Sequence, residues 1–461
     1  MVRSPPTPWR VAAIACMASY IDAAAIVGTG AAFVLYQGAG ILGPTDIGIL
    51  SSALTLSIAA GALFGGRLGD RFGRRVVFLA TMLLIVLGAT GLIFSPNIAL
   101  MLIGAIAVGL GCGADLPVSL ATISEAASDA NRGKLVGLSQ VLWYTGIIAT
   151  YALQLVIGGM GALGGQIVFG HVAVAALIVF VLRLGIPEST EWRAARAERE
   201  AGAASYRART ARLKDIVANK SLRVAFLSLL VFYSLTNLAA NTKGQFGTYV
   251  NVNVVGLTVQ QSSLISLLTL PISIAFAVWF MRIVDGRRRM VFFSVGVASL
   301  TAAFAVPAVF GFTLLTIIIA QLLFGFGSAF AFEGIMKVWT QESFPTLLRS
   351  SAQGAIIAAA RVVAAALALW TPALLSAPQV MYAILAVAVL VGAGVAGRPF
   401  RSPRRPPPRG PGPGGGGGAG SVARPPRGPP GPPPPAARPA AQRGGPGAPP
   451  PSPLVCAGGA P

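Results

Sequence analysis

Twelve long apolar runs, separated by short polar links, constrain what this chain can fold into. A transmembrane helix needs about 20 apolar residues, because each residue rises about 1.5 Å and the hydrocarbon core is about 30 Å thick. The runs lie at residues 11–36, 47–65, 76–94, 97–123, 135–158, 166–186, 222–246, 262–282, 290–310, 312–337, 349–375 and 379–397. The sequence therefore predicts an all-α membrane protein with twelve transmembrane helices in two six-helix halves.

The composition supports this fold class and excludes others. Hydrophobic residues make up 54% of the 461 and charged residues 11%, and the mean hydropathy is +0.73, which no water-soluble fold of this size carries. The net charge of +21 comes from bases in short loops and in the C-terminal segment, without interleaved aromatic residues. We therefore expect the bases to orient the protein in a lipid bilayer and expect no nucleic-acid partner. The three cysteines are scattered and have no metal-ligand spacing, so neither disulfides nor zinc is indicated. We expect no cofactor.

Lysine and arginine also predict the topology, since cytoplasmic loops are enriched in them. The links at 65–75, 125–134, 187–223, 282–289 and 338–349 contain Lys or Arg, and the alternate links at 37–46, 95–97, 159–165, 247–261 and 376–379 contain none. The sequence thus predicts a multi-pass plasma-membrane protein with both termini in the cytoplasm. The expected parts are an N-terminal half (1–187), a cytoplasmic linker (188–221), a C-terminal half (222–397) and a Pro/Gly/Arg-rich tail (398–461).

The tail from residue 398 has a different composition from the rest of the chain. It contains Pro, Gly, Ala and Arg but no Asp, Glu or Lys, so it cannot form an apolar core. Two interpretations stay open. It is a disordered segment with polyproline II character near the anionic inner leaflet, or a shifted reading frame has replaced the native end.

A ten-residue hairpin, Gly66-Arg67-Leu68-Gly69-Asp70-Arg71-Phe72-Gly73-Arg74-Arg75, separates the second and third runs. Its glycines allow close backbone approach or positive φ, and its arginines anchor it at the cytoplasmic face. The order G-x-L-x-D-R-x-G-R-R resembles the loop between helices 2 and 3 of the major facilitator superfamily. The resemblance implies the fold of that family and a gating role for Gly66, Asp70, Arg71, Gly73, Arg74 and Arg75.

Further motifs resemble the sugar porter branch of that family. The stretch from Asp22 to Thr29 resembles the D-x-x-x-I-x-G-T motif in helix 1 of that branch. Four further stretches resemble motifs of the branch: Glu125 with Arg132-Gly133 and Gln140, Pro187-Glu188-Ser189 with Trp192, Glu342-Ser343-Phe344-Pro345 with Arg349, and Trp370-Thr371-Pro372. The resemblance implies that Asp22 couples protons. It also implies that Glu125 with Arg132, and Glu342 with Arg349, form cytoplasmic gating clusters.

The chain departs from the branch at its substrate site. Ala105 stands where an arginine is expected in helix 4, and Arg361 where helix 11 often has a sugar-binding Gln. The Q-Q-x4-N pattern of helix 7 is absent, and Asn241 and Lys243 lie in that region. A short basic stretch from Asp285 to Arg289 is either an eroded repeat of the hairpin or a coincidence.

Charged groups at bilayer depth each need a partner, a cavity or a function, because even on a permissive scale each costs roughly 2.5 to 3.5 kcal/mol. The sequence predicts three acids, Asp22, Asp115 and Glu333, and three bases, Lys243, Lys337 and Arg361, which balance. Asp22 lies half-way along its helix and is assigned to proton coupling, with an inter-half ion pair as the alternative. Asp115 lies in a Gly- and Pro-containing helix that we expect to be bent or closely packed. It either binds substrate, shares the proton or packs helices together through hydrogen bonds.

The remaining buried polar groups are candidates for substrate binding. Glu333 and Lys337 are i and i+4 and can pair with each other, whereas Arg361 has no acid on its own helix and should point into a cavity. Amide and aromatic groups on the fifth run suit a hydroxyl-rich solute, although interhelical hydrogen bonds explain them as well. The predicted substrate-binding residues are Gln140, Tyr144, Asn241, Lys243, Glu333 and Arg361.

Together these patterns indicate a secondary active transporter rather than an enzyme. The predicted substrate is a sugar or a polyol such as inositol, moved with protons by alternating access in a monomer. The alternatives are an organic anion or aromatic acid as substrate, and a non-transporting nutrient sensor built on the same fold.

Overall fold

The computed structural model of the protein describes residues 7–95, 97–127, 132–200, 216, 218–284, 286–344 and 346–400. The regular elements in these residues are the helices α1 (Pro8–Gly38), α2 (Pro44–Phe72), α3 (Arg74–Phe94), α4 (Ile98–Ala126), α5 (Arg132–Ile157), α6 (Ala162–Leu184), α7 (Thr190–Glu200), α9 (Lys220–Asn253), α10 (Val259–Ile283), α11 (Arg289–Phe310), α12 (Leu314–Ala331), α13 (Glu333–Ser343), α14 (Thr346–Leu374) and α15 (Pro378–Phe400). Twelve spans in this part of the chain are long and apolar enough to cross a membrane, with α12 and α13 forming one of them. The predicted all-α fold with twelve spans is confirmed.

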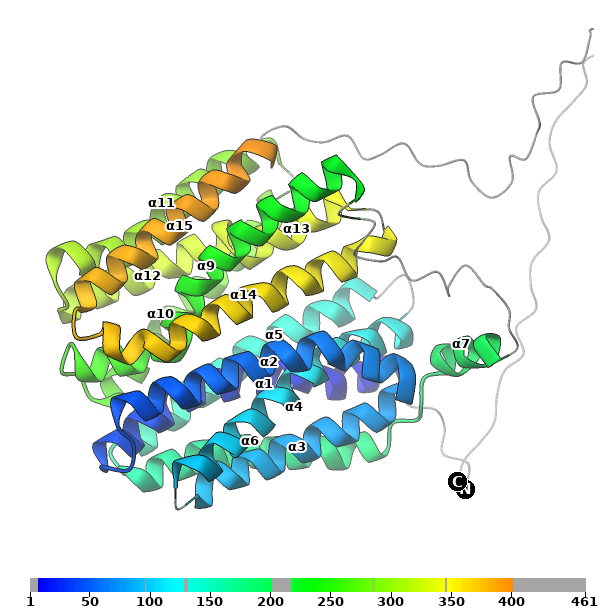
Figure 1. Ribbon diagram of the computed structural model, residues 1–461, viewed down its shortest axis with the longest axis horizontal. Helices are drawn as coiled ribbons and strands as arrows, with labels where there is room; N and C mark the ends of the chain where they lie inside the picture. Colours follow the sequence, from blue (N-terminus) through cyan, green and yellow to red (C-terminus); the bar gives the residue numbers. More distant parts are fainter. Residues whose placement is uncertain are drawn as a thin grey trace, which may run out of the picture. The chain divides into compact units, whose positions relative to one another are not determined.

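The spans pack as two six-helix halves, α1–α6 and α9–α15 (Figure 1, blue to cyan and green to orange). In the first half α4 packs against α2 and α3, and α1 packs against α5 and α6. In the second half α9 packs against α14 and α15, and α11 packs against α12 and α15. The halves meet where α2 contacts α14, α5 contacts α10 and α1 contacts α9.

Close helix packing surrounds Asp115, as its glycine-rich sequence predicts. Pro117 lies inside α4, and a Cβ on Gly109 would lie 2.6 Å from the carbonyl oxygen of Leu54 on α2. A Cβ on Gly111 would likewise lie 2.9 Å from the carbonyl oxygen of Thr81 on α3. The absence of side chains at these positions lets α2, α3 and α4 approach at backbone distance.

Two predicted element boundaries are wrong. The hairpin at 66–75 is helical except at one residue, since α2 continues to Phe72 and α3 begins at Arg74. Gly73 makes the whole turn with φ +100° and ψ 156°, a conformation open to glycine alone. The tenth run is also not one continuous helix, because the backbone at Phe332 has φ −134° and ψ −125° and separates α12 from α13.

The predicted limits of the linker and the tail stay predictions. α7 lies inside the predicted linker, and α9 begins at Lys220, two residues before the predicted start of the second half. α15 ends at Phe400, so the tail after it lies outside the described residues.

The bundle has two ends, which we name by their loops. The basic end carries the α2–α3 turn at Gly73 and the start of α1, and the far end carries the α1–α2 and α9–α10 connections. Hydrogen bonds join the halves at the far end. They run from Ser52 Oγ to the Ala365 carbonyl oxygen (2.8 Å), from Ser263 Oγ to Gln154 Oε1 (3.0 Å), from Asn253 Nδ2 to Gln37 Oε1 (3.2 Å) and from Gln245 Nε2 to the Ser51 carbonyl oxygen (3.1 Å).

Candidate functional site

Asp22 lies in the middle of α1, where its helix faces both halves. Its residue is only 4% exposed, and the Trp143 side chain on α5 contributes a hydrogen bond to its carboxylate. Its electrostatic partners are Arg361 on α14 and Glu333 on α13, both from the other half. The sequence analysis gave an inter-half ion pair as the alternative role of Asp22, and the structure identifies Arg361 as its basic partner in the other half.

Glu333 begins α13 and lies beside the break in the tenth span. Its carboxylate pairs with Lys337 Nζ at 2.6 Å, as the i, i+4 spacing predicts, and it also interacts with the Tyr233 hydroxyl. The Glu333 and Lys337 side chains are each 42% exposed although they belong to a membrane-spanning segment. A broken helix with a polar pair at the break suits a solute-binding site, because the break exposes backbone groups and the helix N-terminus to a ligand.

The predicted binding residues on α5 are only partly brought to this site. Tyr144 is half-buried, packs edge to face on Trp143 with ring centroids 5.4 Å apart, and interacts electrostatically with Glu333. Gln140, about one turn nearer the basic end, is exposed. The aromatic pair therefore lies within electrostatic range of the carboxylates, whereas Gln140 lies nearer the basic end of the same helix.

On α9 the predicted residues point in two directions. Asn241 Nδ2 donates to Gln245 Oε1 at 3.4 Å, and Gln245 also accepts from Thr55 of α2 at 3.1 Å, so both amides belong to the far-end contact between the halves. Lys243 lies between them in sequence and faces away. Its Nζ is 5.4 Å from the centroid of the Phe324 ring on α12.

Asp115 forms a buried ion pair that the sequence analysis missed. Arg183, near the end of α6, contacts both carboxylate oxygens, at 2.5 and 2.9 Å, and the two side chains are 0% and 1% exposed. Thr81 and Ser119 donate further hydrogen bonds to the carboxylate at 2.9 and 3.3 Å, and the guanidinium lies 4.2 Å from the Phe78 ring centroid. These contacts support the packing role for Asp115 over the proton-coupling role. They also correct the predicted balance of three acids and three bases, since Arg183 is a fourth base.

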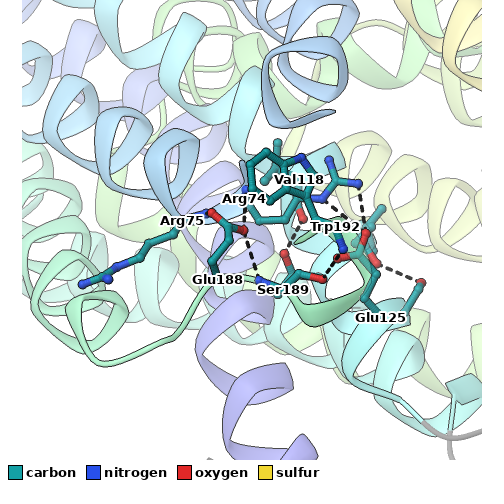
Figure 2. Close-up of polar contacts among 10 residues, drawn as sticks. Arg74, Arg75, Val118, Glu125, Glu188, Ser189 and Trp192 are labelled. Carbon is teal, nitrogen blue, oxygen red and sulfur yellow. Dashed lines mark hydrogen bonds and ion pairs between the residues drawn. The ribbon is translucent and has the colours of Figure 1, made fainter. Parts of the chain in front are cut away.

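At the basic end, Glu188 organises the start of α3 (Figure 2). Its carboxylate accepts from the backbone N–H groups of Arg74 (2.8 Å) and Arg75 (3.2 Å), which have no partner within the helix. The Arg74 guanidinium turns instead toward Glu125 on α4, with Nη2 2.9 Å from Oε1. Glu188 belongs to the predicted Pro187-Glu188-Ser189 motif, but no role was predicted for its carboxylate.

The second half repeats this ion pair. Arg289 is the first residue of α11, the third span of its half, and it contacts both oxygens of Glu342 near the end of the fourth span, at 2.5 and 3.1 Å. Arg74 and Glu125 hold the same places in the first half. This correspondence favours the repeat over coincidence for the basic stretch that ends at Arg289.

The other predicted gating residues have mixed outcomes. The side chains of Asp70, Arg132 and Arg349 lie outside the described residues, so their pairing stays a prediction. Arg71 is exposed, and its guanidinium carbon lies 5.2 Å from the centroid of the Phe72 ring. Arg75 Nη2 donates to the Leu184 carbonyl oxygen at 3.1 Å.

Gly73 offers a direct test of this turn. Gly73→Ala should lower the free energy of unfolding by about 1–3 kcal/mol, because alanine is strained at φ +100° and its Cβ would collide with the Glu188 carboxylate. Thermal unfolding of the purified protein in detergent measures the change. Gly66→Ala is the matched control, since a Cβ there would meet only Pro117 Cβ at 3.9 Å. Equal melting temperatures for the two variants would contradict this account of the turn.

Comparison with known proteins places this arrangement in a family. Residues 12–369 match the Major Facilitator Superfamily. The chain belongs to this superfamily. Within it, the chain is 33% identical over 379 residues to the minor myo-inositol transporter IolF of Bacillus subtilis (strain 168), covering 78% of this chain and 83% of that protein.

Two further superfamily relatives bear on substrate and fold. The putative niacin/nicotinamide transporter NiaP of Bacillus subtilis (strain 168) is 25% identical over 326 residues, covering 70% of this chain and 77% of that protein. The crystal structure of a D-xylose-proton symporter matches with a TM-score of 0.66 over 84% of this chain and 95% of that chain, at 20% identity. At 20% identity the structural match shows only that the two proteins share a fold, and the shared fold covers 95% of the symporter chain.

Proposed function

We propose that this protein is a secondary active transporter that moves a small polyhydroxylated solute, a sugar or a polyol such as inositol, across the plasma membrane together with protons. Membership of the superfamily and the identity to an inositol transporter over most of both chains support the substrate class. Two aromatic side chains near the inter-half carboxylates, Trp143 and Tyr144, suit the hydroxyl groups and the apolar face of a sugar.

The position of Asp22 carries the proton-coupling part of the proposal. A buried carboxylate on α1 whose charged partners, Arg361 and Glu333, both lie in the other half links its protonation to the separation of the halves. Motion of one half against the other changes the distance between Asp22 and these charges, and Coulomb energy depends steeply on distance in a low dielectric. Binding or release of a proton at Asp22 would therefore favour one arrangement of the halves.

The inter-half contacts suggest which side of the membrane the site faces. Among the residues that the structure describes, the hydrogen bonds that join the halves lie at the far end. The distribution of Lys and Arg predicts that the basic end is cytoplasmic. We infer a conformation that is closed toward the outside and faces the cytoplasm. The Arg74–Glu125 and Arg289–Glu342 pairs each join two helices within one half at the basic end. This is the end that would close when the protein faces the outside.

Asp22→Asn tests the coupling. Active accumulation of the solute in proteoliposomes with an imposed pH gradient should vanish, because asparagine keeps the shape of the side chain but cannot carry a proton. Exchange of labelled for unlabelled solute without a gradient should remain within a few-fold, because binding and rocking need no proton release. Uptake of myo-inositol, D-xylose and nicotinate measures both activities and identifies the substrate class.

The outcomes separate the alternatives. Asp46→Asn is the matched control, since Asp46 caps the start of α2 at the far end by accepting from the Gly43 N–H at 2.8 Å, and it should leave accumulation intact. Accumulation that survives Asp22→Asn would dismiss the proton role. Loss of exchange as well would indicate a structural ion pair. Transport of nicotinate alone would favour the hypothesis of an organic-acid substrate, in line with the niacin/nicotinamide relative.

A further inference from the structure

The charges enclosed by the bundle do not balance. We count the charged residues of the described spans that lie away from the helix ends or reach inward. The acids are Asp22, Asp115 and Glu333, and the bases are Arg183, Lys243, Lys337 and Arg361. Three acids face four bases, which leaves one excess positive charge. Because isolated charges are costly at bilayer depth, the identity of the unmatched base is informative.

The contacts assign three of the four bases to acids. Arg183 is bound to both oxygens of Asp115, and Lys337 is bound to Glu333 at 2.6 Å. Arg361 interacts electrostatically with Asp22 and also with Glu333. The acids with described side chains nearer the helix ends are engaged as well: Asp46 at the start of α2, Glu125 with Arg74, Glu188 at the start of α3 and Glu342 with Arg289. Lys243 is the base left over.

Lys243 lies in the interior part of α9 and reaches toward α12. It lies ten residues before Asn253, the last residue of α9, and so about 15 Å from the far end of that helix. Its neighbours Asn241 and Gln245 face α2, and Lys243 extends the opposite way to the Phe324 ring on α12, 5.4 Å from the ring centroid. α9 packs mainly on α14 and α15 rather than on α12, so the long lysine side chain reaches from α9 to a helix that is not its main neighbour. The residue is half-buried.

The Phe324 ring offsets only part of the cost of this ammonium group. A cation–π contact supplies no hydrogen-bond acceptor, and a lysine ammonium has three N–H donors. With Asp22 ionised, a single negative charge would neutralise the excess, whereas a phosphate ester, with about 1.5 to 2 negative charges at pH 7, would overcompensate it. A carboxylate therefore fits the charge of the site better than a phosphate does.

We propose that Lys243 is a specificity residue that binds the carboxylate of a polyhydroxylated acid, so that the transporter takes a sugar acid in preference to the corresponding neutral sugar. This inference rests on the proposed function and names the substrate class more narrowly. The hydroxyl groups of such a solute use the same aromatic groups, Trp143 and Tyr144, as a sugar does. Its carboxylate adds the charge that the bundle lacks.

The test compares two solutes that differ in one group, D-glucose and D-glucuronate, in proteoliposomes containing the full-length protein. We expect a higher kcat/KM for glucuronate in the unmodified protein. Lys243→Met should lower kcat/KM for glucuronate about ten- to a hundredfold, the effect of losing one charge-assisted hydrogen bond, and should change glucose uptake by no more than a few-fold. Lys243→Arg keeps the charge and should restore most of the preference.

Lys220→Met is the matched control, because it removes a lysine charge from the exposed start of the same helix. It should leave the preference unchanged. Equal losses for both solutes in Lys243→Met, or a protein that transports glucose and other neutral polyols but does not prefer glucuronate, would overturn the inference and leave the proposed function standing. A protein that transports no sugar, polyol or sugar acid at all would instead overturn the proposed function, and the inference with it.

Discussion

Arg183→Met is expected to destabilise the N-terminal half by about 3–5 kcal/mol, because it leaves the Asp115 carboxylate buried without a counter-charge. Both side chains are essentially inaccessible, at 0% and 1%, and the guanidinium contacts both carboxylate oxygens. Thr81 and Ser119 would remain as hydrogen-bond donors but carry no charge. Thermal unfolding in detergent and the fraction of monodisperse protein measure the loss.

Two further variants isolate the effect of the charge. Asp115→Leu combined with Arg183→Met replaces the pair with apolar groups and should recover most of the lost stability, because no unpaired charge remains buried. Arg289→Met removes an arginine from a pair of similar geometry whose carboxylate is 42% exposed, and it should cost no more than about 1 kcal/mol. A double variant as unstable as the single one would show that Arg183 acts through packing rather than through its charge.

The position of Arg183 explains why the sequence did not reveal this pair. It stands at the end of an apolar run, next to a link already rich in Arg and Lys, where an arginine normally faces the cytoplasm. Only the packing of α3, α4 and α6 brings Asp115, 68 residues away, within reach of it. The predicted balance of charges failed for this reason.

Features that depend on local spacing were predictable. The twelve spans follow from the lengths of the apolar runs, and the Glu333–Lys337 pair follows from i, i+4 geometry on one helix. The Glu188 contact with the start of α3 was not predictable, because it joins residues 114 positions apart through backbone N–H groups. The opposite directions of Asn241 and Lys243 follow from helical periodicity, but which of them faces α2 depends on the packing of the halves.

Gly30→Ala is expected to shift the protein out of the conformation described here. Gly30 on α1 packs so closely on α9 that a Cβ would overlap the backbone carbonyl oxygen of Gln245. The carbonyl oxygen is part of the α9 backbone, and the added Cβ would be bonded directly to the α1 backbone. The overlap can therefore be relieved only if the two helices move apart. Overpacking of this kind costs about 1–3 kcal/mol, which corresponds to about a five- to a hundredfold change in the population of the closed far end.

The closed far end depends on the same region of α9. The Gln245 side chain donates to the Ser51 carbonyl oxygen and accepts from Thr55, each at 3.1 Å, so a shift of α9 away from α1 also weakens its contact with α2. If the protein alternates between two closed ends, destabilising one of them favours the other. Gly30→Ala should therefore expose the far end and slow net transport, since each cycle must pass through the disfavoured conformation.

Thiol labelling measures this shift. Ser51→Cys, in a background without the native cysteines, places a thiol at a position that is 1% exposed in the present conformation. A membrane-impermeant maleimide added from outside should label it at least about five times faster when Gly30→Ala is also present. Gly38→Ala, on the same helix but with nothing within 4 Å of its Cβ, should leave both labelling and transport unchanged. If the two alanine variants behave alike, the close contact between α1 and α9 does not control the far end.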